Sequence, residues 1–220
     1  MGRGVPLVRL DNVWKRFEGQ ATWVLNGINL EAGPGSLTLI MGRNGSGKTT
    51  LLRITAGLVE PSKGRVLVGG RPPTSREARM MMGAVLHSPL VYEELTVLEN
   101  LEYYAGLYGV RGYDPRNDVV AEALGVTKVL GSRVSSLSFG WRRRVDIVRA
   151  LIHKPQVLLL DEPTTGLDDE TVESLLDVTL ELSRRGMAVV ATSPRRLDSA
   201  IERGYRALEL VDGRLGVPRT

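Results

Sequence analysis

One segment of eight residues restricts the possible folds of this chain more than any other. Residues 42–49 read Gly-Arg-Asn-Gly-Ser-Gly-Lys-Thr and match the pattern G-x-x-x-x-G-K-[ST] in full. The apolar run 36–41 precedes the segment, as expected for a strand buried on both faces, and residues 49–58 follow with helical spacing. A chance glycine-rich turn is the alternative, but the strand–loop–helix order favours a loop that binds phosphate.

Backbone amides are what this loop offers to a ligand. Glycine tolerates positive φ angles, so consecutive N–H groups can turn inward onto phosphate oxygens, and the helix N-terminus adds partial positive charge. Lys48 is expected to reach the β- and γ-phosphates of a nucleotide, and the Thr49 hydroxyl to bind Mg²⁺. The candidate nucleotide-binding residues here are Gly42, Arg43, Asn44, Gly45, Ser46, Gly47, Lys48, Thr49 and Thr50.

A second buried run, residues 157–160, leads directly into two carboxylates, Asp161 and Glu162. A carboxylate at the end of a buried strand can hold Mg²⁺ through water, and Asp161 suits that role. Glu162 is placed one residue further on, where it can orient or deprotonate an attacking water. The pair could instead cap a helix N-terminus, but beside a complete phosphate loop the nucleotide interpretation is favoured.

The other patterns predict an α/β chain. Residues 7–13 and 24–30 read as strands, and residues 188–192 as a third buried strand. A helix is expected over residues 171–185, and a terminal hairpin over residues 207–215. Buried strands that alternate with helices indicate a mainly parallel sheet with helices on both faces.

The middle of the chain has a different character. From about residue 88 to residue 151 the sequence is rich in Glu, Leu, Ala, Tyr and Arg, and it favours helix. We interpret this stretch as a helical subdomain inserted into one domain that spans residues 1–220.

Composition excludes several classes of protein. The 220 residues include no cysteine, which excludes disulfides and thiolate metal sites, and two histidines do not favour a multi-histidine metal site. No apolar run approaches the roughly 18 residues of a membrane span, and the first residues lack the apolar core of a signal peptide. The net charge of +4 does not require a nucleic-acid partner. We therefore expect a soluble, cytoplasmic protein.

Three motifs follow one another along the chain: GRNGSGKTT, then LSFGW with RRR, then VLLLDEPTTGLD. In this order they resemble the nucleotide-binding subunit of ABC transporters, and the resemblance covers nearly the whole chain. It implies a P-loop NTPase core with a mainly parallel sheet, an N-terminal antiparallel β region and an inserted helical subdomain. It also implies an ATPase that works as a head-to-tail dimer, with ATP and Mg²⁺ between the phosphate loop of one chain and the signature motif of the other.

The same resemblance implies a separate integral membrane transporter subunit, which would choose the cargo. The chain would then be a peripheral protein on the inner face of the cell membrane, with residues 87–104 forming part of the groove for that partner. The dimer is expected to be either a homodimer or a heterodimer with another ATP-binding subunit. No nucleic-acid partner is expected.

Further residues match functional positions of the family one by one. Phe17, in KRF, resembles the aromatic residue that stacks on adenine, although it could also be a core aromatic. Ser138 and Gly140 retain the groups that offer a hydroxyl and a backbone N–H to the γ-phosphate of the partner's ATP. Asp168 resembles the residue that links the two active sites, and it can also cap the helix that follows.

The signature motif departs from the family pattern. The family reads Leu-Ser-Gly-Gly-Gln. In this chain Phe139 replaces the first glycine of that motif, and Trp141 replaces the glutamine. Both side chains add bulk, which would either weaken closure on ATP or reshape the contact. The run 142–144, three arginines, could be a solvated helix face.

Two polar positions also differ. His87 stands where the family has a glutamine that senses Mg²⁺ and the attacking water, a feature similar to haem-exporter ATPases. Ser193 stands where the family has a histidine that contacts the γ-phosphate. Serine carries no charge, and the loss of a charge-assisted hydrogen bond costs on the order of 2–4 kcal/mol in the transition state.

Three functions are compatible with these features. The leading hypothesis is the ATP-hydrolysing subunit of a transporter, and the compact chain resembles exporter-type ATPases. The altered signature and Ser193 motivate a second, a nucleotide-gated clamp or the degenerate half of a heterodimer with little turnover. The third is an ABC-type ATPase that acts on ribosomes or DNA, although the tandem cassettes or long coiled coils usual in that class are absent from the sequence.

Overall fold

The computed structural model describes residues 5–218, and its centre is a six-stranded sheet with the strand order β5-β6-β7-β3-β8-β9. The first five strands run parallel and β9 is antiparallel to β8, which confirms the predicted mainly parallel sheet. In this order the strands are β5 (Met82–Val85), β6 (Val157–Leu160), β7 (Ala188–Ser193), β3 (Leu37–Met41), β8 (Arg206–Val211) and β9 (Arg214–Gly216).

A second, three-stranded sheet lies beside the first and is antiparallel throughout, in the order β2-β1-β4. Its strands are β1 (Val8–Lys15), β2 (Leu25–Ala32) and β4 (Lys63–Val68). The predicted N-terminal antiparallel region is therefore confirmed.

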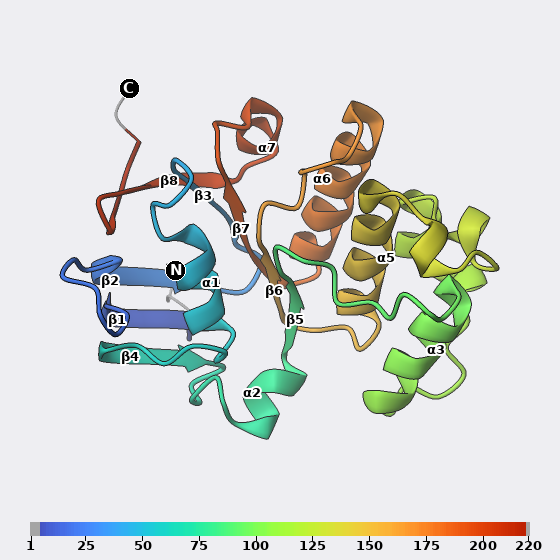
Figure 1. Ribbon diagram of the computed structural model, residues 1–220, viewed down its shortest axis with the longest axis horizontal. Helices are drawn as coiled ribbons and strands as arrows, with labels where there is room; N and C mark the ends of the chain where they lie inside the picture. The colour runs from blue at the N-terminus through green and yellow to red at the C-terminus, as the bar shows by residue number, and fades with distance from the viewer. Residues whose placement is uncertain (1–4, 219–220) are drawn as a thin grey trace.

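The buried strands separate two hydrophobic clusters. Helix α1 (Lys48–Thr55) packs between the two sheets, where Ile40 of β3 faces it. Helices α5 (Phe139–Leu151) and α6 (Asp169–Arg184) cover the opposite face, where Leu39 points. Figure 1 shows α1 on one side of the central sheet and α5 and α6 on the other. Because neighbouring residues of a strand point to opposite faces, a strand covered on both sides must be apolar throughout, which explains the run at 37–41.

Residues 88–151 contain three α-helices joined by loops and short 3-10 turns. Helix α3 (Val97–Leu107) begins with a capping box formed by Thr96 and Glu99, and it packs against α5. Helix α4 (Val119–Ala123) is short and contacts α6. The interpretation of this stretch as an inserted subdomain stays a prediction.

Two short helices complete the described chain, α2 (Arg76–Met80) and α7 (Asp198–Glu202). Within residues 5–218, none of the helices combines the length and the apolar character needed to cross a membrane.

Candidate nucleotide-binding site

The carboxyl ends of four parallel strands meet at one edge of the central sheet, and every strongly predicted site residue follows one of them. The phosphate loop follows β3, His87 follows β5, the acidic pair follows β6, and Ser193 ends β7. A cavity of about 350 Å³ opens at this edge. Its lining comprises Phe17, Gln20, Val24, Asn44, Gly45, Gly47, Lys48, Thr49, Thr50, His87 and Glu162.

The phosphate loop has the backbone that the glycines were expected to allow. Gly45 and Gly47 have φ angles of 82° and 106°, in the region that side chains disfavour. A Cβ atom on Gly47 would also lie 2.9 Å from the carbonyl oxygen of Val24, so only glycine fits there. Helix α1 begins directly afterwards and has no side-chain cap, which leaves its first N–H groups free to bind an anion.

Lys48 brings a buried cation to the centre of the site. Its side chain is only 4% exposed, and its Nζ atom donates to the carbonyl oxygens of Gly42, at 2.8 Å, and Arg43, at 3.2 Å. The same Nζ atom lies 3.2 Å from Oε1 of Glu162. The loop after β3 and the acidic pair after β6 are therefore joined by an ion pair.

Asp161 is fully buried and keeps one carboxylate oxygen uncommitted. Oδ1 accepts a hydrogen bond of 2.8 Å from the hydroxyl of Thr192, whereas Oδ2 has no hydrogen-bond partner among the described residues. A buried carboxylate oxygen without a partner is costly unless a cation or its water occupies the space beside it. The hydroxyl of Ser46 is buried and unpaired in the same way.

These donors fit Mg²⁺, a hard cation that prefers oxygen ligands. Asp161 offers a free oxygen, and Thr49 contributes a hydroxyl to the cavity lining. Residues 5–218 contain no group of three or more His, Asp or Glu side chains that could hold a metal by themselves.

Glu162 is held in an unusual backbone conformation. Its φ angle is 47°, in the left-handed region, and its side chain is 15% exposed. Its N–H donates to Oγ1 of Thr192 at 2.9 Å, and its carbonyl oxygen accepts from Arg143 at 3.1 Å. The peptide on each side of Glu162 is thus fixed, and the carboxylate points towards Lys48.

Phe17 and His87 both line the cavity. The Phe17 ring is 38% exposed, with Nζ of Lys15 at 4.9 Å from its centroid, so it is no core aromatic. His87 is exposed at the other side of the lining, after β5. Trp14 and Trp23, two other aromatic residues close to Phe17 in the sequence, contact each other edge to face.

Ser193 behaves differently from the other candidates. Its hydroxyl donates to the carbonyl oxygen of Arg195 at 2.6 Å and accepts from the N–H of the same residue. It is buried and does not line the cavity, so the structure does not bring it together with Lys48 and Glu162.

The signature residues lie at the N-terminus of α5, outside the cavity lining. Ser138 caps the helix and accepts from the N–H of Trp141. Gly140 packs so tightly that a Cβ atom would lie 2.3 Å from the carbonyl oxygen of Gly166. Glycine is therefore required here by contacts within the chain itself, while Phe139 stays 44% exposed.

Asp168 caps α6, as one of its two expected roles requires. Its Oδ1 accepts from the N–H of Thr171 at 2.9 Å and from its hydroxyl at 2.7 Å, and its Oδ2 pairs with Arg144. The hydrogen bond from the Thr171 side chain, with that from its backbone, lowers the pKa of Asp168. The carboxylate is exposed and therefore also accessible to a second chain.

Sequence reasoning missed two residues, Thr192 and Arg143, which contact the acidic pair. It also offered a solvated helix face for the three arginines at 142–144, and this is wrong. Arg143 is fully buried, and the other two form ion pairs with Glu93 and Asp168. The helix packs against the ends of β5 and β6, which the arginine triplet alone does not reveal. The signal that could have revealed Arg143 is the three-residue spacing of Arg143, Asp146 and Arg149, which brings three charged side chains to neighbouring positions on the helix.

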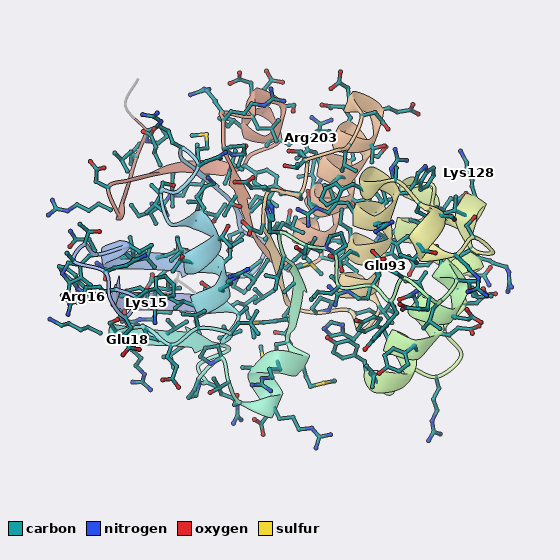
Figure 2. The ribbon with its side chains drawn as sticks, viewed as in Figure 1. Lys15, Arg16, Glu18, Glu93, Lys128 and Arg203 are labelled. Carbon is teal, nitrogen blue, oxygen red and sulfur yellow. The ribbon has the colours of Figure 1, made fainter. Side chains whose placement is uncertain are left out.

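Figure 2 labels one residue near the cavity and one that pairs with the signature helix. Lys15, next to Phe17 at the cavity, lies at the β-rich side of the view, whereas Glu93, the partner of Arg142 in α5, lies at the helical side. One chain therefore presents a phosphate cavity and a separate signature surface.

Comparison with known proteins places this architecture in a family. The family model described as ABC transporter matches residues 25–165, which include the phosphate loop, the signature and the acidic pair. The ABC transporter ATP-binding protein YhcH of Bacillus subtilis is 35% identical over 191 residues, or 85% of this chain, and the chain spans 61% of the length of that relative. The cytochrome c biogenesis ATP-binding export protein CcmA of Cupriavidus necator is 37% identical over 77% of this chain and 76% of its own.

A solved structure shares the whole fold. The dimeric structure of MJ0796, a bacterial ABC transporter cassette, superposes with a TM-score of 0.79 and 28% identity, over 96% of this chain and 97% of that one. With its phosphate loop, its acidic pair and its signature helix in the order that the family model matches, this chain belongs to the ABC transporter family as a nucleotide-binding subunit.

Proposed function

We propose that this chain binds and hydrolyses ATP and thereby drives transport by a separate membrane subunit. One observation carries the proposal: Lys48 and Glu162 meet in the cavity at the N-terminus of helix α1, and Asp161, whose Oδ2 atom has no partner within residues 5–218, directly precedes Glu162. A buried cation, a buried metal ligand and a positioned carboxylate in one place are what phosphoryl transfer requires.

The proposed roles follow from the contacts. Loop amides and Lys48 hold the phosphates, Phe17 stacks on adenine, and His87 faces the same cavity from the end of β5. Bound Mg²⁺, held by the Thr49 hydroxyl and Asp161, would neutralise charge on the phosphates. Glu162 orients a water and accepts its proton as the water attacks the γ-phosphate. The ammonium of Lys48, 3.2 Å from Oε1 of Glu162, holds this carboxylate at the cavity.

A second copy of a cassette completes the site in this proposal. Ser138, Gly140 and Asp168 lie outside the chain's own cavity but are presented at helix N-termini, where N–H groups attract anions. The dimeric state of the related MJ0796 cassette supports a head-to-tail dimer. The partner is either a second copy of this chain or another ATP-binding subunit.

The proposed contact with the membrane subunit lies on the segment after His87 and on α3. Tyr92, Tyr103 and Tyr104 form a cluster with ring centroids 5.2–6.1 Å apart, and two of the three are more than two-fifths exposed. Leu90 is similarly exposed beside them. An exposed aromatic patch of this kind suits a partner helix, which supports the proposed contact with a membrane subunit.

The self-contained Ser193 loop favours a second candidate, a nucleotide-gated clamp with little turnover. Two measurements on the purified chain separate the candidates: the steady-state rate of phosphate release, and the oligomeric state with and without Mg-ATP. Hydrolysis that disappears in Glu162→Gln supports the enzyme. ATP-dependent dimerisation without any hydrolysis, even beside the membrane partner, supports the clamp, and absence of ATP binding excludes both.

A further inference from the structure

A single buried guanidinium joins two of the loops that border the cavity. Arg143 lies in the first turns of α5 and has no exposed surface. Its Nη2 atom donates to the carbonyl oxygens of Asp161, at 2.7 Å, and Glu162, at 3.1 Å, and its Nη1 atom donates to that of Leu86. One side chain from the signature helix therefore fixes both the acidic pair and the residue before His87.

The contact bears on the backbone where Glu162 is strained. A left-handed conformation is unfavourable for an L-residue and persists only where neighbouring contacts hold it. Thr192 binds the N–H of Glu162 from β7, and Arg143 binds its carbonyl oxygen from α5. The direction of the Glu162 carboxylate thus depends on two side chains outside the catalytic loop.

Burial disfavours the charged form of the Arg143 guanidinium unless nearby carboxylates and hydrogen bonds compensate for the lost hydration. Burial lowers the pKa of Arg143, while the charges of Asp146, Asp161 and Glu162 raise it. Its Nε atom is buried with no partner within residues 5–218, so the side chain is not placed for maximal hydrogen bonding. A buried charge is by itself weak evidence that a residue stabilises the fold. The three carbonyl partners of Arg143 all belong to segments that border the cavity, which points to a role at the site.

We propose that Arg143 is a positioning residue for ATP hydrolysis. It holds the Asp161–Glu162 turn and the Leu86 carbonyl in one fixed arrangement, so that the Glu162 carboxylate keeps its place beside Lys48 and the His87 segment keeps its position relative to it. This rests on the proposed ATPase function. Charge-assisted hydrogen bonds to both loops make the guanidinium a direct connection between the signature helix and the residue proposed as general base.

A matched pair of variants tests the role. Arg143→Met removes the cation, and Arg149→Met removes a buried arginine two turns further along the same helix, which contacts Asp146 and the carbonyl oxygen of Ala84 within β5. Both variants should lose stability. Arg143→Met should lower kcat about 10- to 100-fold with KM for ATP changed less than about threefold, because misplacement of a catalytic group by an ångström has effects of this size. Arg149→Met should keep kcat per folded molecule within about threefold.

Arg143→Lys supplies the rescue, because it retains a charged donor that can reach fewer carbonyls, and it should recover at least part of the lost kcat. Hydrogen exchange adds a readout that needs no activity. Arg143→Met, or Arg143→Lys where the former does not fold, should accelerate amide exchange at residues 86–89 and 161–165, whereas Arg149→Met should not. Parent-like kcat together with unchanged exchange in both segments would overturn the proposal. Loss of hydrolysis by the parent chain would count against the ATPase instead, and the exchange data would still decide the role of Arg143.

Discussion

The ends of β6 and β7 lie side by side, but the loop after β6 directs a side chain into the cavity and the loop after β7 does not. The two strands pair in parallel, with Leu160 beside Ala191. After β6 the chain enters a strained turn that directs Glu162 towards Lys48. After β7 the hydroxyl of Ser193 is satisfied by the backbone of Arg195.

This difference indicates that the chain is well equipped for phosphate binding and water activation and poorly equipped to stabilise the γ-phosphate from the β7 side. Phosphate binding and water activation have buried, charged groups with short contacts. The position after β7 offers no charge to the γ-phosphate, since serine is neutral and already bonded. We therefore expect tight nucleotide binding combined with modest turnover.

Removal of the general base gives the largest effect. Glu162→Gln keeps the size of the side chain but cannot accept a proton, so hydrolysis should fall at least about 100-fold. ATP binding, measured by equilibrium titration, should stay within a few-fold of the parent. Hydrolysis at the parent rate would show that the carboxylate after β6 is not the base, and the contrast between the two loops would disappear.

Thr192 is the bridge between the two loops, and its loss should rank second. Its hydroxyl donates to Oδ1 of Asp161 and accepts from the N–H of Glu162, so Thr192→Val removes a hydrogen bond from each of the two acidic residues. We expect kcat to fall about 10- to 100-fold and stability to fall by about 1–3 kcal/mol in urea unfolding. Thr55→Val is the control, because its buried hydroxyl bonds only to Leu51 within α1. An equal loss of kcat in both variants would refute the bridging role.

Phe17 tests the adenine side of the cavity, which neither loop reaches. Phe17→Ala should weaken ATP binding about tenfold, because stacking of a base on an aromatic ring contributes about 1–3 kcal/mol. Trp23→Ala is the control, since this ring is flanked by Arg16 and Lys63 outside the cavity lining. Isothermal titration with Mg-ATP measures both. Weaker binding in the control alone would assign the stacking role to Trp23.

Ser193→Ala should give the smallest effect. The hydroxyl bonds within its own loop, so its loss should reduce stability by about 1 kcal/mol and change kcat less than about threefold. Thermal unfolding and phosphate release measure the two quantities. A fall in kcat of tenfold or more would mean that the serine turns into the cavity during the reaction. The loops after β6 and β7 would then both contribute a side chain to catalysis.

Contiguous motifs made the phosphate loop and the acidic pair predictable from the sequence. Residues 42–49 and 157–162 each contain a buried strand end and its functional residues in one stretch, so local pattern sufficed. The bounds of β6 follow from its four apolar residues. The strands β4 and β5 were not predicted, because β4 begins with exposed Lys-Gly-Arg and β5 is only four residues long.

Thr192 and Arg143 could not be predicted because their roles arise from tertiary contacts. Thr192 matters because β7 pairs with β6, and Arg143 because α5 packs across the ends of β5 and β6. Ser193 was placed correctly at the end of β7, but the turn that captures its hydroxyl depends on the following loop. Sequence spacing gives the position of a side chain along the chain and leaves its direction to the packing around it.

A structure of the Glu162→Gln variant with Mg-ATP would decide whether this site is correct. We expect the triphosphate on the amides of residues 42–49 beside Lys48, with the metal between Thr49 and Asp161 and the side chain at 162 facing the γ-phosphate. A nucleotide bound elsewhere, or a metal that leaves Oδ2 of Asp161 without a partner, would contradict it.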